Sequence, residues 1–224
     1  AINQLNALCH LRHLLSGDPE LARVNLPGGL NYWFLHNVKE LQQWAGEIAA
    51  GSDPVAIRHK AVDMLYVLDG TGCIAQDVLH ASPGGGNTPD DDTLTRVAAI
   101  PLVNCSLTPN ITGFLSHIHN HLGAMFQSPG VLREQVTQAG EISTELDVIN
   151  AWLEHIHQDA RQLVALDNPH LVEDEGIHLR GEISALAMRV LNGGSDPGTG
   201  RAEKGAAAIA GQIQQLATMD ITRY

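Results

Sequence analysis

The sequence contains no cluster of lysine or arginine residues, and its formal net charge at pH 7 is −12. Since basic side chains supply most of the affinity for phosphate groups, this absence argues against a nucleic-acid partner and against an anionic membrane surface. No apolar run approaches the ~20 residues that cross a bilayer. The first residues, AINQLNALCH, lack the basic and apolar regions of a signal peptide. We therefore expect a protein of the cytoplasm, or of a particle assembled inside the cell.

Cysteine is scarce, and the three residues present, Cys9, Cys73 and Cys105, form no CxxC pair. An odd number without paired spacing argues against a disulfide framework and favours a reducing compartment. The sequence also lacks a GxSxG elbow, a P-loop, an HExxH helix and a CxxCH haem-attachment motif. These absences favour a protein that is not an enzyme and holds no cofactor. Asn104 and Asn110 match the glycosylation acceptor pattern, but short matches of this kind are common by chance.

What the sequence does contain is helical periodicity, interrupted by glycine and proline. Sustained period-2 alternation is absent, and the one segment that would tolerate a strand is 97–107, where Pro101 argues against a central position. We expect an all-α fold, a multi-helix bundle of about seven to nine helices with Gly/Pro-punctuated loops. The expected helices cover 2–16, 30–50, 54–69, 71–81, 90–100, 109–127, 131–166, 170–192 and 201–219.

Glycine and proline also mark the loops and the helix starts. The longest irregular stretch is ASPGGGNTPDDD, so a loop boundary is expected near 82–92, although both sides have the same character and we predict a single domain over 1–224. Asp-Pro pairs at Asp18, Asp53 and Asp196 predict helix N-termini, because aspartate caps free backbone N–H groups and proline needs none in the first turn.

Three histidines are concentrated in FLSHIHNH, at 114–121. We expect a helix capped by Thr108, and its phase places Ile118 at the centre of an apolar stripe. On this phase His119 and His121 lie to either side of the stripe, and His117 points toward water. Only His117 and His121 share a flank, so only this pair can chelate one ion.

The stretch WLEHIHQD, at 152–159, repeats the same design around Ile156. One interpretation is that the two helices pack through Ile118 and Ile156, with the imidazoles at the edge of the core. The other is that the helices meet along their histidine flanks and form a metal site within a bundle, with zinc as the example of the ion. The candidate ligands for that site are His117, His121, His155, His157 and Glu154.

The amino-terminal segment CHLRH is a further ligand-like cluster. Cys9 and His13 are four residues apart and could bind zinc, but the cluster has no second ligand pair at metal spacing. A cysteine beside Leu5 and Leu8 is also explained as a small core residue.

Aromatic residues are few, at 4%, and several occur in the helix expected over 30–50. A helix that is apolar on nearly all sides lies either in the core or at a subunit interface. The candidate interface residues are Tyr32, Trp33, Phe34 and Trp44. The Ala-rich end of the chain suits close helix packing, either as a docking tail or as a terminal helix.

Together these features predict a non-enzymatic structural or assembly subunit that forms homo-oligomers, such as a virion component. Its partner would be another copy of itself or another protein. The alternative is a metal-binding helical-bundle protein, or a metal-dependent enzyme, built on the histidine clusters.

Overall fold

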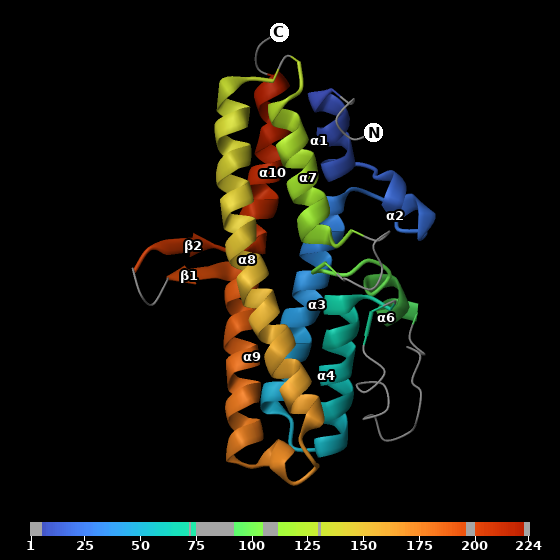
Figure 1. Cartoon of the computed structure of the whole chain (residues 1–224), viewed down its shortest axis with the longest axis vertical. Coiled ribbons are helices and arrows are strands. Elements are labelled where there is room, and N and C mark those ends of the chain that lie inside the picture. Colours follow the sequence, from blue (N-terminus) through green and yellow to red (C-terminus); the bar gives the residue numbers. More distant parts are fainter. Residues whose placement is uncertain are drawn as a thin grey trace.

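The computed structural model describes residues 6–71, 73–74, 92–104, 112–129, 131–195 and 200–221. It is an elongated helical bundle with one small hairpin on its side (Figure 1). The predicted all-α multi-helix bundle is thus confirmed. Its helices are α1 (Ala7–Leu15), α2 (Pro19–Arg23), α3 (Leu30–Ala50), α4 (Pro54–Asp69), α6 (Asp92–Val97), α7 (Phe114–Phe126), α8 (Arg133–Ala165), a 3₁₀ turn η2 (His170–Val172), α9 (Asp174–Asn192) and α10 (Ala206–Ile221).

The longest helix, α8, organises the bundle. Along its length it packs against α7 and α10 toward one end and against α4 and α9 toward the other (Figure 1). Helix α3 also contacts partners at both ends, since it packs on α1 and α10 as well as on α4 and α9. One cluster of buried apolar side chains continues through these helices, and both Ile118 and Ile156 belong to it with no exposed surface.

Two of the three predicted Asp-Pro helix starts are observed. Asp18 caps α2, where its side chain accepts hydrogen bonds from the backbone N–H groups of Glu20 and Leu21. Asp53 caps α4 through the N–H of Val55. Asp196 lies outside the described residues.

The hairpin is a departure from the sequence-based prediction. Strand β1 (Gly193–Ser195) pairs antiparallel with β2 (Ala202–Lys204), whereas we expected a helix from residue 201 and tolerated a strand only at 97–107. Glycine explains the difference. Gly193 ends α9 with φ at +83°, and a Cβ on Gly205 would lie 2.2 Å from the Gly193 nitrogen, so the two strands leave the bundle in close backbone contact.

Helix α7 also begins later than predicted. Thr112 is not helical, Gly113 occupies the N-cap position, and the expected cap Thr108 lies outside the described residues. A Cβ on Gly113 would lie 2.6 Å from the Val103 carbonyl oxygen, so this glycine permits close packing on the preceding segment. The expected helix over 71–81 and the loop near 82–92 fall almost entirely outside the described residues, and the single-domain assignment stays a prediction.

Cys73 is disulfide-bonded, whereas Cys9 is a free, partly buried thiol. The sequence argued against a disulfide framework and favoured a reducing compartment, and the bond at Cys73 departs from that expectation. Sequence spacing alone did not indicate this, because a disulfide depends on which Cα atoms the fold brings within bonding range.

The aromatic residues of α3 lie mostly inside the chain's own core. Trp33, Phe34 and Trp44 are buried, and among the four predicted interface residues only Tyr32 is exposed, at 62%. The apolar residues of α10, such as Ile209 and Ile213, are also buried within the bundle. Within the described residues, no helix combines the length and apolar character needed to cross a membrane.

Candidate metal centre

Four histidines and one aspartate gather where α1, α2 and α7 meet, at one end of the bundle (Figure 1). Helix α1 supplies His10 and His13, and α7 supplies His117 and His121, whose rings stack with centroids 5.0 Å apart. Asp18 joins them because it is fixed as the cap of α2. The i,i+4 spacing therefore does place His117 and His121 on one flank, as the sequence predicts.

Nearly all of this group is removed from solvent. The side chains of Asp18 and His121 are each 1% exposed, that of His117 is 4% exposed, and that of His13 is 19% exposed. The expectation that His117 points toward water is wrong. Its outward flank is covered because α2, with Asp18 and Glu20, lies against it.

The two carboxylate oxygens of Asp18 face different partners. Oδ1 lies 2.8 Å and 3.2 Å from the backbone nitrogens that it caps. Oδ2 lies 3.8 Å from His13 Nδ1, 3.7 Å from His121 Nε2 and 3.6 Å from His117 Nε2. These separations exceed a hydrogen bond of ~2.7–3.2 Å. They are close to the ~3.3 Å between two ligands of a tetrahedral ion with bonds of ~2.0–2.1 Å.

His13, Asp18 and His121 form a complete three-donor group, in which one ligand atom of each lies within 4.8 Å of the others. No other such group of histidine, cysteine, aspartate or glutamate occurs in the part of the chain that the structure describes. His117 is adjacent to this group, with its Nδ1 3.5 Å from Glu20 Oε2. It is thus a candidate fourth donor that would need a small movement.

Several ring nitrogens of the cluster have no hydrogen-bond partner among the described residues, although they are buried. These are Nδ1 of His13, Nδ1 of His117 and Nε2 of His121. A buried polar atom without a partner costs roughly 1–3 kcal/mol, and native proteins contain few of them. A bound ion would satisfy the nitrogens of His13 and His121.

His10 supports His121 from the side opposite Asp18. The two Nδ1 atoms are 2.9 Å apart and share one hydrogen bond, and His10 has no exposed surface. If His121 bound an ion through Nε2, its Nδ1 would carry the proton and would donate to His10. This is the outer-shell arrangement that fixes the tautomer of metal-binding histidines.

The electrostatics favour the ligand forms of these groups. Burial lowers the pKa of His13, and the neighbouring His121 lowers it further. Burial also lowers the pKa of His117, more than Asp18 and Glu20 raise it. For Asp18, burial raises the pKa, but the contact with His121, the charge of His117 and the capped N–H groups together lower it below its usual value. Neutral imidazoles beside a carboxylate are the forms that bind a metal ion.

The remaining predicted ligands lie elsewhere. His157 Nε2 is 3.0 Å from Asp69 Oδ2, at the end of α4. His155 Nε2 lies 3.7 Å from Asp159 Oδ2. Glu154 accepts a hydrogen bond from Asn150. The structure therefore does not bring the two histidine clusters into one donor group.

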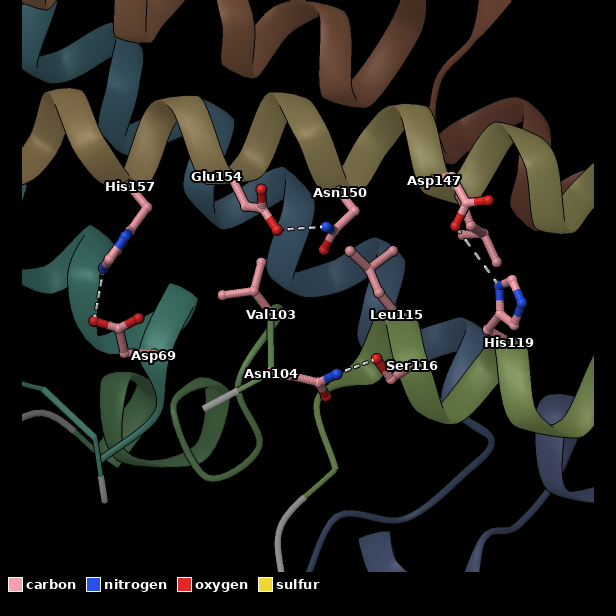
Figure 2. A pocket seen from close by; sticks show the side chains of 11 residues that line it. Asp69, Val103, Asn104, Leu115, Ser116, His119, Asp147, Asn150, Glu154 and His157 are labelled. Carbon is pink, nitrogen blue, oxygen red and sulfur yellow. Dashed lines mark hydrogen bonds and ion pairs between the residues drawn. The ribbon is translucent and has the colours of Figure 1, made fainter. Parts of the chain in front are cut away.

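The antiparallel packing of α7 and α8 separates the two clusters. Figure 2 shows Leu115 of α7 beside Asn150 of α8, with the helices running in opposite directions. From this point His121 lies six residues along α7 in one direction, and His157 lies seven residues along α8 in the other. At 1.5 Å per residue the two histidines are roughly 20 Å apart.

The structure gives two residues of the candidate centre roles that the sequence does not indicate. From the sequence, His13 was predicted to pair with Cys9, four residues before it, and Asp18 was predicted only to cap a helix. The cap interpretation is correct but incomplete, because it accounts for one carboxylate oxygen. The sequence signal for the site is the pair of histidines at 10 and 13 followed by a capping aspartate, set against the later pair at 117 and 121.

Comparisons with protein-family models, with curated proteins and with solved structures found no match to this chain.

Proposed function

We propose that this protein binds a transition-metal ion, zinc in the first instance, through His13, Asp18 and His121. The observation that carries the proposal is the convergence of His13, Asp18 and His121, two of them buried and His13 partly so. The ligand nitrogens, Nδ1 of His13 and Nε2 of His121, have no hydrogen-bond partner among the described residues. Two imidazoles and one carboxylate suit zinc and neighbouring ions. Calcium and magnesium prefer oxygen ligands only, and a soft ion such as Cu(I) prefers thiolates.

The burial of the donors supports a structural ion rather than a catalytic one. A structural zinc ion is enclosed by its protein ligands, and His117 stands next to the three-donor group as the fourth. Such an ion would join the amino-terminal helices α1 and α2 to α7, which begins far later in the chain. Its binding free energy would then add to the stability of the fold.

The test is elemental analysis of protein purified without chelator, followed by titration of the metal-free protein with zinc sulfate against a competing chelator. We expect one zinc ion per chain. His121→Ala and Asp18→Asn should each weaken zinc binding by about 100-fold or more. Asparagine retains the capping ability of residue 18, so the second variant separates the ligand role from the cap.

His119→Ala is the matched control, because His119 lies on the same helix with a half-exposed side chain outside the donor group. It should bind zinc as the unmodified protein does. The proposal is wrong if the unmodified chain takes up no stoichiometric zinc, or if His119→Ala and His121→Ala lose the same affinity.

The homo-oligomeric structural role stays a prediction. Its main sequence support is the apolar character of α3, and the burial of Trp33, Phe34 and Trp44 inside the chain accounts for those residues without a partner.

A further inference from the structure

A cavity of about 430 Å³ lies between the end of α4, residues 103–104, α7 and α8, away from the candidate metal centre (Figure 2). Its base is apolar and buried, since Val103, Leu115 and Leu146 are 8%, 4% and 2% exposed. Polar side chains surround this base. The cavity therefore offers one apolar wall and a polar rim.

Hydrogen bonds hold the side chains of the polar rim, and two of these bonds join different elements. His157 of α8 bonds to Asp69 of α4 at 3.0 Å. Asn104 donates to Ser116 of α7. On α8 itself, Asn150 donates to Glu154 at 2.7 Å. These bonds order the side chains before any ligand arrives, which reduces the entropy lost on binding.

The charge of the rim is negative. Asp69, Asp147 and Glu154 contribute carboxylates, and the described lining contains no lysine or arginine. An anionic ligand is thus disfavoured by like charge, and a cationic ligand is favoured.

Asp147 and Glu154 are too far apart to bind the same metal ion. Asp147, Asn150, Glu154 and His157 form one stripe along α8, at intervals of three and four residues. Asp147 and Glu154 are seven residues apart, or about 10 Å along the axis. Oxygen ligands of one cation lie ~2.0–2.6 Å from it, which is far too close for this pair.

We propose that this cavity binds a linear aliphatic polyamine. One terminal ammonium group would pair with Asp147 and the other with Glu154. The internal ammonium would face the side-chain oxygen of Asn150, which lies between them on α8, and the methylene segments would lie against Val103 and Leu115. Nine single bonds join the terminal nitrogens of spermidine. Three residues of extended backbone also contain nine bonds along the chain, so the two nitrogens of extended spermidine lie about 10–11 Å apart. The proposal is independent of the metal centre, since the two sites share no residue.

Isothermal titration calorimetry at pH 8 with spermidine as the probe tests the inference. We expect saturable binding at one site with a Kd below about 1 mM. Putrescine has only five bonds between its nitrogens and spans about 6 Å, so it can contact both carboxylates only with each ammonium displaced inward, and it carries one positive charge fewer. It should bind at least about tenfold more weakly.

Substitutions locate the site on the protein. Asp147→Asn and Glu154→Gln change exposed side chains, so the fold should be retained, and each should weaken spermidine binding about threefold to tenfold. Glu175→Gln removes the same charge from an exposed position on α9 and should leave the affinity unchanged. This control separates binding in the cavity from general attraction to an acidic chain.

Three results would overturn the proposal: no saturable binding of spermidine, equal affinity for putrescine, or equal weakening by Glu175→Gln and the two cavity variants.

Discussion

Asp18 performs two tasks because its two carboxylate oxygens point to different partners. Oδ1 satisfies the backbone at the start of α2, and Oδ2 faces three imidazole nitrogens. The cap fixes the rotamer, so the second oxygen reaches the histidines in a defined position. A helix start and a candidate ligand are thus combined in one side chain.

A different buried aspartate, Asp159, is not well accommodated as a carboxylate. It is 4% exposed, and its Oδ2 has no hydrogen-bond partner among the described residues. Burial raises the pKa of Asp159, and His155 opposes this only in part. Since the folded pKa lies above the unfolded one, this group's contribution to stability is present at low pH and lost as pH rises through the folded pKa.

We therefore predict that Asp159→Asn increases the free energy of unfolding at pH 7 by about 0.5 kcal/mol, a small value because solvent screens part of the charge. At pH 3, which lies below both the ordinary pKa of the carboxyl and its raised folded pKa, the increase should be smaller because the folded carboxyl is largely protonated. Urea unfolding at both pH values measures the difference, with the exposed Asp147→Asn as control. A loss of stability at pH 7, or an equal gain at both pH values, would contradict this account.

At the scale of elements, two buried arginines each cap the C-terminus of a helix from another part of the chain. Arg58 of α4 donates to the carbonyl oxygens of Val164 and Leu166, at the end of α8. Arg180 of α9 donates to the carbonyl oxygens of Ile48 and Gly51, at the end of α3. Each guanidinium satisfies free carbonyl groups and meets the negative end of a helix dipole.

Some elements also pack with their backbones in close contact. Gly29, just before α3, lies against the backbone at the end of α1 and allows this contact to be tested. A Cβ at Gly29 would lie 2.4 Å from the carbonyl carbon of Leu15 and 2.5 Å from the oxygen of Leu14. We predict that Gly29→Ala lowers the free energy of unfolding by about 2 kcal/mol or more, because backbone must move to make room.

Gly46 is the matched control, within the helix that Gly29 precedes, and a Cβ added there would have no atom within 4 Å. Gly46→Ala should raise the free energy of unfolding by about 0.5–1 kcal/mol through helix propensity. Chemical denaturation of both variants gives the comparison. If both substitutions stabilise the protein, the proposed close contact at Gly29 is incorrect.

These elements were largely predictable because their signals are local. The helices over 30–50 and 54–69 match α3 and α4, and 131–166 differs from α8 by one or two residues at each end. Apolar periodicity and Asp-Pro or glycine boundaries determine such elements. The hairpin was not predictable by the same means, since GGS and AEK contain no β-branched residue.

The candidate metal centre was predictable only in part. The shared flank of His117 and His121 follows from helical phase, so one helix is enough to predict it. Their meeting with His13 and Asp18 depends on α1 and α2 folding back onto α7, which no local pattern reports. The expected pairing with His155 and His157 required these residues to lie beside His117 and His121. The antiparallel packing of α7 on α8 instead sets the two histidine clusters apart.

For the whole molecule, the proposed ion would act at one end of the bundle. Removing zinc with a chelator should lower the midpoint of thermal unfolding by about 5–10 °C at a metal concentration near 100 times the Kd. Amide hydrogen exchange should become faster in α1, α2 and α7, which the ion joins. Exchange in α4 and α9 should change little.

His121→Ala supplies the control for this experiment, because it should show no response to the chelator. A chelator-dependent shift of the same size in that variant would place the ion elsewhere. Faster exchange spread evenly over the bundle would argue against a local joining role.

The two buried arginines have a consequence for the behaviour of the protein in solution. The chain has 13 lysine and arginine residues against 25 aspartate and glutamate residues, and Arg58 and Arg180 are 7% and 6% exposed. Part of the small positive charge therefore caps helix ends inside the molecule. Because Asp18, Glu145 and Asp159 are buried too, the outer surface keeps nearly the whole acidic excess of the composition. Copies of the chain repel one another at low ionic strength, so any self-association would strengthen as added salt screens that repulsion.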